Sequence, residues 1–268
     1  QEDVISPPHD AELLSAGGLV VEWTGGHGEA VVSISLNRPH TRNSQSVETW
    51  QGLRHIGEVL PAGTRIVIVR GEGGTFSSGL DRSAFDPAAA FSLSSMADLP
   101  DDVLSARISE FQAGFAWLSD NPSVISIAAV DGAAVGAGFQ LALACDLRIA
   151  TPAARFSMRE ATLGLVPDLT GTHPLVRLIG YSRALEICVT SRWVAADEAF
   201  HWGLVNSVSN DLLGDTTALV AHLLALAPAT LRETKELLQG AQELSPHDQR
   251  KREREAQVRL IKGTFGST

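Results

Sequence analysis

The stretch AAVDGAAVGAGFQLALACDLRIA, residues 128–150, decides the fold class of this 268-residue chain. It begins inside an apolar strand, turns at three glycines, continues as an apolar helix from Gly136 and ends in a second short strand, DLRIA. A strand, a helix and another strand in this order are typical of an α/β protein with a largely parallel sheet. We therefore expect the α/β class.

The sequence around this stretch predicts a polar N-terminal arm (residues 1–18), a core (residues 19–208) and a helical tail (residues 209–268). Core strands are expected at residues 19–23, 29–36, 65–71 and 123–132, with a Gly25–Gly28 hairpin turn, a helix capped by Ser46 that runs to about Leu60, and a helix over 103–118. Residues 84–102 form a long connection with room for one helical turn. Long connections are often lids or binding loops.

Composition narrows the class of protein further. The chain is 44% hydrophobic and 19% charged with a net charge of −10, which argues against a disordered chain and against a nucleic-acid binder. No run approaches the roughly 18 apolar residues of a membrane span, and the polar N-terminus does not resemble a secretory signal. We expect a cytoplasmic protein with no membrane or nucleic-acid partner, and Cys145 and Cys188 as buried, reduced thiols.

Two glycine-containing loops are candidates for an anion site. The first, FSSGLD (residues 76–81), and the second, DGAAVGAGFQ (residues 131–140), each follow a predicted buried strand. Two backbone N–H groups that converge on one point form an oxyanion hole. Taken singly, each loop is equally well explained as an ordinary connection, with glycines that allow close packing of a helix on a sheet.

Two carboxylates flank an apolar segment further along the chain. Glu160 and Asp168 bracket residues 161–167, ATLGLVP. A carboxylate in apolar surroundings has a raised pKa and exchanges protons near neutral pH. The alternative is structural, with Glu160 as a surface charge and Asp168 as the N-cap of the following helix.

Taken together, these segments resemble the enoyl-CoA hydratase/isomerase, or crotonase, family over residues 31–208. The resemblance rests on Asn37-Arg38-Pro39 with Asn43, on FSSGLD and AAVDGAAVGAGFQLALACDLRIA, and on FSMREATLGLVPDLTGTHPLVRLIG and AADEAFHWGLVNSV. It implies a ClpP/crotonase-like spiral of ββα turns with a C-terminal helical region used for assembly. Homotrimers or dimers of trimers are expected.

The resemblance also implies an acyl-CoA thioester substrate, as in fatty acid metabolism, without a metal or a cofactor other than the CoA of the substrate. The thioester oxygen is expected to accept from the backbone N–H groups of Leu80 and Ala137. The family pattern places substrate-binding residues at Ser78, Asp81, Arg82 and Ser83, and at Arg42 near the nucleotide end of CoA.

One position departs from the hydratase pattern. Family hydratases carry two glutamates, and the first position here is Gln140, while Glu160 fills the second. Glutamine cannot transfer a proton, although it can orient a water. Asp168 matches an aspartate of dienoyl-CoA isomerases. We therefore expect a shift of a double bond in an enoyl- or dienoyl-CoA with Glu160 as base. Hydration, another acyl-CoA reaction and acyl-CoA binding without catalysis stay as alternatives.

Overall fold

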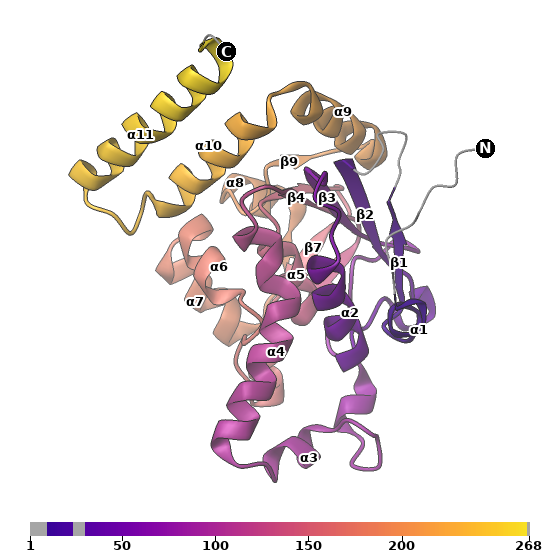
Figure 1. The fold of residues 1–268 in the computed structure, drawn as a ribbon. Helices are drawn as coiled ribbons and strands as arrows, with labels where there is room; N and C mark the ends of the chain where they lie inside the picture. Colours follow the sequence, from indigo (N-terminus) through magenta and orange to yellow (C-terminus); the bar gives the residue numbers. More distant parts are fainter. Residues whose placement is uncertain (1–9, 24–29, 267–268) are drawn as a thin grey trace.

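The computed structural model describes residues 10–23 and 30–266, which form two sheets surrounded by helices (Figure 1). The larger sheet has the order β1-β2-β3-β4-β6-β9. Its strands are β1 (Leu19–Glu22), β2 (Val31–Leu36), β3 (Ile66–Gly71), β4 (Ile125–Val130), β6 (Leu147–Ala150) and β9 (Ser207–Val208). Neighbours are parallel except β1, which pairs antiparallel with β2. These strands confirm the predicted α/β class.

The smaller sheet joins β5 (Ala133–Val135), β7 (Arg155–Ser157) and β8 (Val194–Ala195) in that order. The chain alternates between the two sheets: β4 and β6 lie in the larger one, whereas β5 and β7 lie in the smaller one. Gly132, with φ of 61°, makes the turn from β4 into β5. This alternation is the spiral of ββα turns that the resemblance implies.

Helices α2 (Val47–Glu58) and α4 (Asp101–Asp120) pack against each other, and both contribute side chains to the main core. Ser46 is the N-cap of α2, as predicted, and its N–H donates to Thr49 Oγ1 at 3.1 Å. The residues of α5 (Ala137–Ala144) are all buried, so its first turn is held rigidly between the sheets and α4.

The expected polar arm is wrong for its described part. Residues Ala11–Ala16 form α1, which packs on α2 and buries Leu14 in the main core. Thr49 Oγ1 also donates to Gly17 O at 2.8 Å, which fixes the end of α1. Residues 10–18 are therefore ordered and docked on α2, with Leu14 reaching the core. The arm's residues 1–9 and the predicted Gly25–Gly28 turn lie outside the described residues.

The connection over residues 84–102 contains more regular structure than one turn. It begins within the 3₁₀ helix η3 (Arg82–Phe85) and includes α3 (Leu93–Ala97), whose Ser92 N-cap accepts from Ser95 N at 3.1 Å. In Figure 1, α3 lies at the bottom, beside the start of α4 and far from the C-terminal helices. This segment therefore borders the space between α2 and α4.

After β7 the described chain is largely helical, as predicted. The helices are α6 (Thr172–Ile179), α7 (Tyr181–Thr190), α8 (Ala196–His201), α9 (Leu212–Ala225), α10 (Pro228–Gly240) and α11 (Pro246–Phe265). No single helix of the described residues meets the length and hydropathy of a membrane span, although α9 and α10, bent by 105°, meet them as a pair. Cys145 is buried and free as expected, whereas Cys188 is free but only half-buried.

A buried ion pair anchors the C-terminal helices to the core. Lys235 of α10, whose side chain is 5% exposed, donates from Nζ to Asp146 Oδ2 and to Val124 O, each at 2.8 Å. Burial raises the pKa of the Asp146 carboxyl, and the Lys235 ammonium opposes that rise. Gln239 Nε2 adds a bond to Ser119 O at 2.6 Å. Helix α10 is thereby fixed to the end of α4.

Replacement of Lys235 by Met is expected to lower the free energy of unfolding by roughly 3–5 kcal/mol, because it leaves a buried carboxylate without its counter-charge. The double variant Lys235→Met/Asp146→Asn should recover part of that loss. Urea unfolding at neutral pH measures both. The control is Arg54→Met, which breaks the exposed pair of Arg54 with Glu58. A loss for Lys235→Met no larger than for this control would contradict the anchoring role.

Candidate active site

The two glycine-containing loops converge, as the sequence predicts. Ser77 N donates to Ala133 O at 3.0 Å and Val135 N donates to Ser77 O at 2.9 Å, which joins the FSSGLD loop to β5. Gly79 has φ of 86°, and a Cβ there would lie 2.6 Å from Val135 O and 3.5 Å from Ala137 N. Only glycine allows this approach. The backbone of Gly79–Leu80 therefore lies against the start of α5.

Both predicted donor groups are available. Ala137 is the first residue of α5, and an N–H in the first turn of a helix has no acceptor within the helix. On the other loop, Gln45 pairs with the two neighbours of Leu80: Gln45 N donates to Gly79 O and Asp81 N donates to Gln45 O. Within the described residues, neither Leu80 N nor Ala137 N donates a hydrogen bond.

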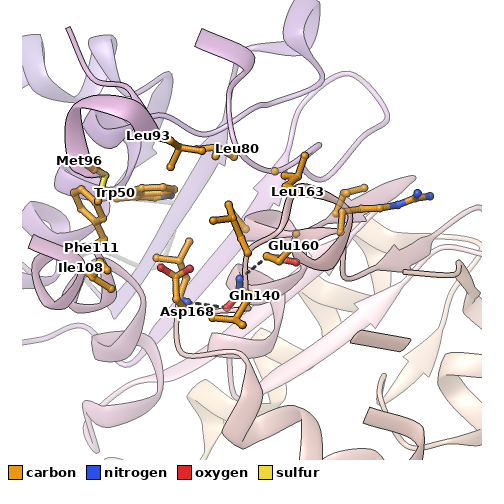
Figure 2. Close-up of a pocket in the computed structure, with 18 of the residues that line it drawn as sticks. Trp50, Leu80, Leu93, Met96, Ile108, Phe111, Gln140, Glu160, Leu163 and Asp168 are labelled. Atoms are coloured by element: carbon orange, nitrogen blue, oxygen red, sulfur yellow. Dashed lines mark hydrogen bonds between the residues drawn. The ribbon is translucent and has the colours of Figure 1, made fainter. Parts of the chain in front are cut away.

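Glu160 begins the 3₁₀ helix η4 (Glu160–Leu163) and is buried beside the start of α5. Gln140 Nε2 donates to Glu160 Oε1 at 2.7 Å, the dashed line between these residues in Figure 2. Gly136 has φ of 51°, and a Cβ there would lie 3.3 Å from Glu160 Oε1. The carboxylate thus lies against the turn that presents Ala137 N. The alternative of Glu160 as a surface charge is wrong.

The orientation of the Gln140 amide is fixed from its other end. Its Oε1 accepts from Leu169 N at 2.8 Å and from Gly171 N at 3.3 Å. These two donors require an oxygen at that position, so the NH₂ group must face Glu160. Glu160 Oε2 is buried and has no hydrogen-bond partner in the described chain. Gln140 therefore holds one oxygen of the carboxylate and leaves the other free.

Burial raises the pKa of Glu160, and the nearby Asp168 carboxylate raises it as well, while the hydrogen bond from Gln140 opposes the rise. Burial also raises the pKa of Asp168. The sequence predicts that the apolar segment over residues 161–167 surrounds the two carboxylates. Leu163, Leu165 and Val166 of that segment line the same cavity as Glu160 and Asp168, although Val166 is 71% exposed. The desolvation comes from the cavity that both carboxylates line, and this segment is one part of its wall.

Asp168 does not cap a helix, since the N-cap of α6 is Gly171. Its main-chain O accepts from Gln112 Nε2 of α4 at 2.7 Å, and it lines the same cavity as Glu160. The structure therefore brings together the three predicted catalytic residues, Glu160, Asp168 and Gln140, and both predicted donors, Leu80 and Ala137, around one cavity.

The cavity has a volume of about 460 Å³, and most of its wall is apolar. Figure 2 shows Trp50, Met96, Ile108 and Phe111 on the side opposite Glu160. Trp50 and Phe111 pack with ring centroids 4.9 Å apart. These wall residues were not predicted from the sequence. The sequence feature that pointed to part of the wall is the long connection over residues 84–102, which supplies Phe91, Leu93, Met96 and Ala97.

Of the five predicted substrate-binding residues, one lines the cavity and four do not. Ser78 lines the cavity, and its Oγ donates to Thr41 O at 3.1 Å. Arg42, Arg82 and Ser83 are exposed and lie outside the cavity lining. Asp81 also lies outside the cavity lining. Among the described residues, no three or more His, Cys, Asp or Glu side chains group in a way that could hold a metal ion.

Asp81 is the N-cap of η3 and has a structural role. It accepts from Ser44 Oγ at 2.6 Å, Ser83 N at 3.0 Å and Arg38 Nη2 at 3.0 Å. Burial alone would raise its pKa, but these hydrogen bonds and the Arg38 charge lower the pKa to about 2. Asp81 is therefore ionised at neutral pH, and its carboxylate is too weak a base to take a proton from a substrate.

The chain is similar to known proteins in sequence and in fold. Residues 26–266 match the family model described as enoyl-CoA hydratase/isomerase. Bacillus subtilis YngF is 36% identical over 77% of both chains, and an Arthrobacter 4-chlorobenzoyl coenzyme A dehalogenase is 30% identical over 77% of this chain and 73% of its own.

Two crystal structures of a Thermobifida fusca protein are similar to the whole fold. The complex with CoA is 42% identical with a TM-score of 0.89, covering 98% of this chain and 99% of the other. The complex with acetoacetyl-CoA is 43% identical with a TM-score of 0.87, covering 94% and 97%. On the family match and this likeness, the chain belongs to the enoyl-CoA hydratase/isomerase family and processes acyl-CoA thioesters.

Proposed function

We propose that the chain shifts a double bond in an enoyl- or dienoyl-CoA, with Glu160 as the base. The observation that carries this proposal is the fixed amide of Gln140. It donates to Glu160 Oε1 and is held at its other end by two backbone N–H groups. The site thus has one buried carboxylate positioned by a group that neither gains nor loses a proton at neutral pH.

The proposed reaction uses these groups as follows. Glu160 takes a proton from the α carbon of a 3-enoyl thioester, and the electron pair of that C–H bond forms an enolate with its charge on the thioester oxygen. Leu80 N and Ala137 N stabilise this oxygen more than they stabilise the neutral carbonyl. Glu160 then returns the proton to the γ carbon, which leaves the double bond between the α and β carbons. With a dienoyl substrate, Asp168 is the second carboxyl available for the returned proton.

Hydration is the second candidate, supported by the family to which the chain belongs. Adding water across a double bond in the two-carboxylate manner needs a second acid at the position of Gln140. Gln140 has no proton to give, so we place hydration below isomerisation. An acyl-CoA-binding protein without catalysis is the third reading, and activity with enoyl-CoA substrates separates it from the other two.

Glu160→Gln is expected to reduce turnover of a 3-enoyl-CoA or 3,5-dienoyl-CoA by about 10²–10⁴-fold, the usual contribution of one proton-transferring group. Its Kd for CoA should not change. Since burial raises the pKa of Glu160, wild-type turnover should fall with decreasing pH at a pH above ~4.3, the ordinary glutamate pKa. Asp168→Asn should reduce turnover of 3-enoyl substrates by less than Glu160→Gln does. Glu58→Gln on the exposed end of α2 is the control. Wild-type turnover by Glu160→Gln would refute the proposed base.

Gln140→Glu is expected to add hydratase activity on a 2-enoyl-CoA, because it supplies the second carboxyl. One oxygen of the new side chain would accept from Leu169 N and Gly171 N as Gln140 Oε1 does. The other would face Glu160 Oε1, so the two carboxyls must share a proton and the pKa of the pair rises. Absorbance of the conjugated thioester measures hydration. If wild type already hydrates faster than it isomerises, hydration replaces isomerisation as the function.

We also propose a homotrimer or a dimer of trimers. The support is the set of exposed apolar side chains on the C-terminal helices: Leu213 and Leu238 are 70% and 66% exposed, and Phe265 is 81% exposed. Light scattering at micromolar concentration should give the mass of three or six chains. A mass of one chain, about 28.4 kDa, would exclude the assembly.

A further inference from the structure

We propose that Gln45 is a positioning residue that links the wall of the acyl cavity to the loop carrying Leu80, and that its backbone directs the Leu80 N–H while its amide holds the loop in that position. The proposal rests on the thioester site described under the proposed function. The sequence analysis gave Gln45 no role, and Gln45 does not line the cavity.

The backbone of Gln45 holds the loop on both sides of Leu80. Gln45 N donates to Gly79 O at 2.7 Å, and Asp81 N donates to Gln45 O at 2.8 Å, so Gln45 and Leu80 form a parallel bridge. In a parallel bridge the middle residue directs its own N–H away from the partner strand. Leu80 N is therefore directed away from Gln45, and it donates to no other described residue.

The side chain of Gln45 also holds this loop, through the hydroxyl of Ser77. Its Nε2 donates to Ser77 Oγ at 3.2 Å, Ser77 Oγ donates to Asn43 O at 2.7 Å, and Gly79 N donates to Ser77 Oγ at 3.2 Å. A hydroxyl has one proton and two lone pairs, so every hydrogen-bonding position of Ser77 is occupied. The Ser78–Gly79 peptide is thus held by a hydroxyl that Gln45 contacts, and the next peptide carries Leu80 N.

The other end of the Gln45 amide reaches the cavity wall. Trp50 Nε1 donates to Gln45 Oε1 at 2.9 Å, and the ring of Trp50 lines the cavity against Phe111. Gln45 and Ser77 are fully buried, and Trp50 is 5% exposed. A buried network of this kind is costly to break at any one member. An acyl group packed on Trp50 therefore packs on the side chain that holds Gln45 in place.

The test is Gln45→Met, which nearly preserves the volume of the side chain and removes both polar groups. Turnover is expected to fall by about 10–10²-fold, as a small misplacement of a catalytic group does. The Kd for acetoacetyl-CoA should rise, whereas the Kd for CoA should not change, because CoA lacks the thioester carbonyl that Leu80 N would contact. Calorimetry with these two ligands measures the difference.

Gln239→Met is the matched control. It removes another long-range glutamine bond, from Gln239 Nε2 to Ser119 O, far from the cavity, and should lower stability without changing either Kd. If Gln45→Met does not fold, Ser77→Ala replaces it, since it breaks the link to Gly79 N and leaves Trp50 intact. A folded variant of either kind with wild-type turnover and wild-type affinity for acetoacetyl-CoA would overturn the proposal.

The two Kd measurements also test the role of Gln45 separately from the proposed reaction. If the wild type does not isomerise enoyl-CoA, the proposed function fails, but the ratio of the two Kd values still reports on the Leu80 N–H. If the wild type isomerises and the ratio is the same in the variant, the role of Gln45 fails alone.

Discussion

The site depends on which way the Gln140 amide faces. Its oxygen is held by Leu169 N and Gly171 N, and its NH₂ group by Glu160. Rotating the amide by half a turn would place two N–H donors against its nitrogen and an oxygen against the carboxylate, so three buried groups would lose their partners. One side chain thereby ties α5, η4 and the start of α6 together. The same amide holds Glu160, the residue that we propose as the base.

Two carboxylates in and near the site have opposite pKa shifts because their surroundings differ. Asp81 accepts three hydrogen bonds and faces Arg38, and its pKa falls to about 2. Glu160 accepts one side-chain bond and is otherwise desolvated, and its pKa rises. The sequence places Asp81 in a glycine-containing loop and Glu160 beside an apolar segment, but it does not show which carboxylate is charge-paired and which is desolvated. The difference arises from partners far away along the chain, such as Ser44 for Asp81 and Gln140 for Glu160.

Much of the fold could be predicted, because its signals are local. Apolar runs bounded by glycine gave β3 and β4, and Ser46 gave the start of α2. The convergence of the FSSGLD loop on α5 followed from two loops after neighbouring strands. The docked helix α1 was missed because it has only six residues and buries a single side chain, Leu14. The apolar wall around Trp50 was missed because its residues come from α2, α3 and α4, and only the tertiary packing brings them together.

Helix α4 connects the cavity to the C-terminal helices. Its first half supplies Leu104, Ile108 and Phe111 to the cavity, and its last turn accepts from Lys235 and Gln239 of α10. The twenty residues of α4 span about 30 Å. An acyl group bulky enough to displace the first half of α4 would act on the same helix that holds α10 at its other end. The wall of the cavity and the seat of α10 therefore belong to one continuous element.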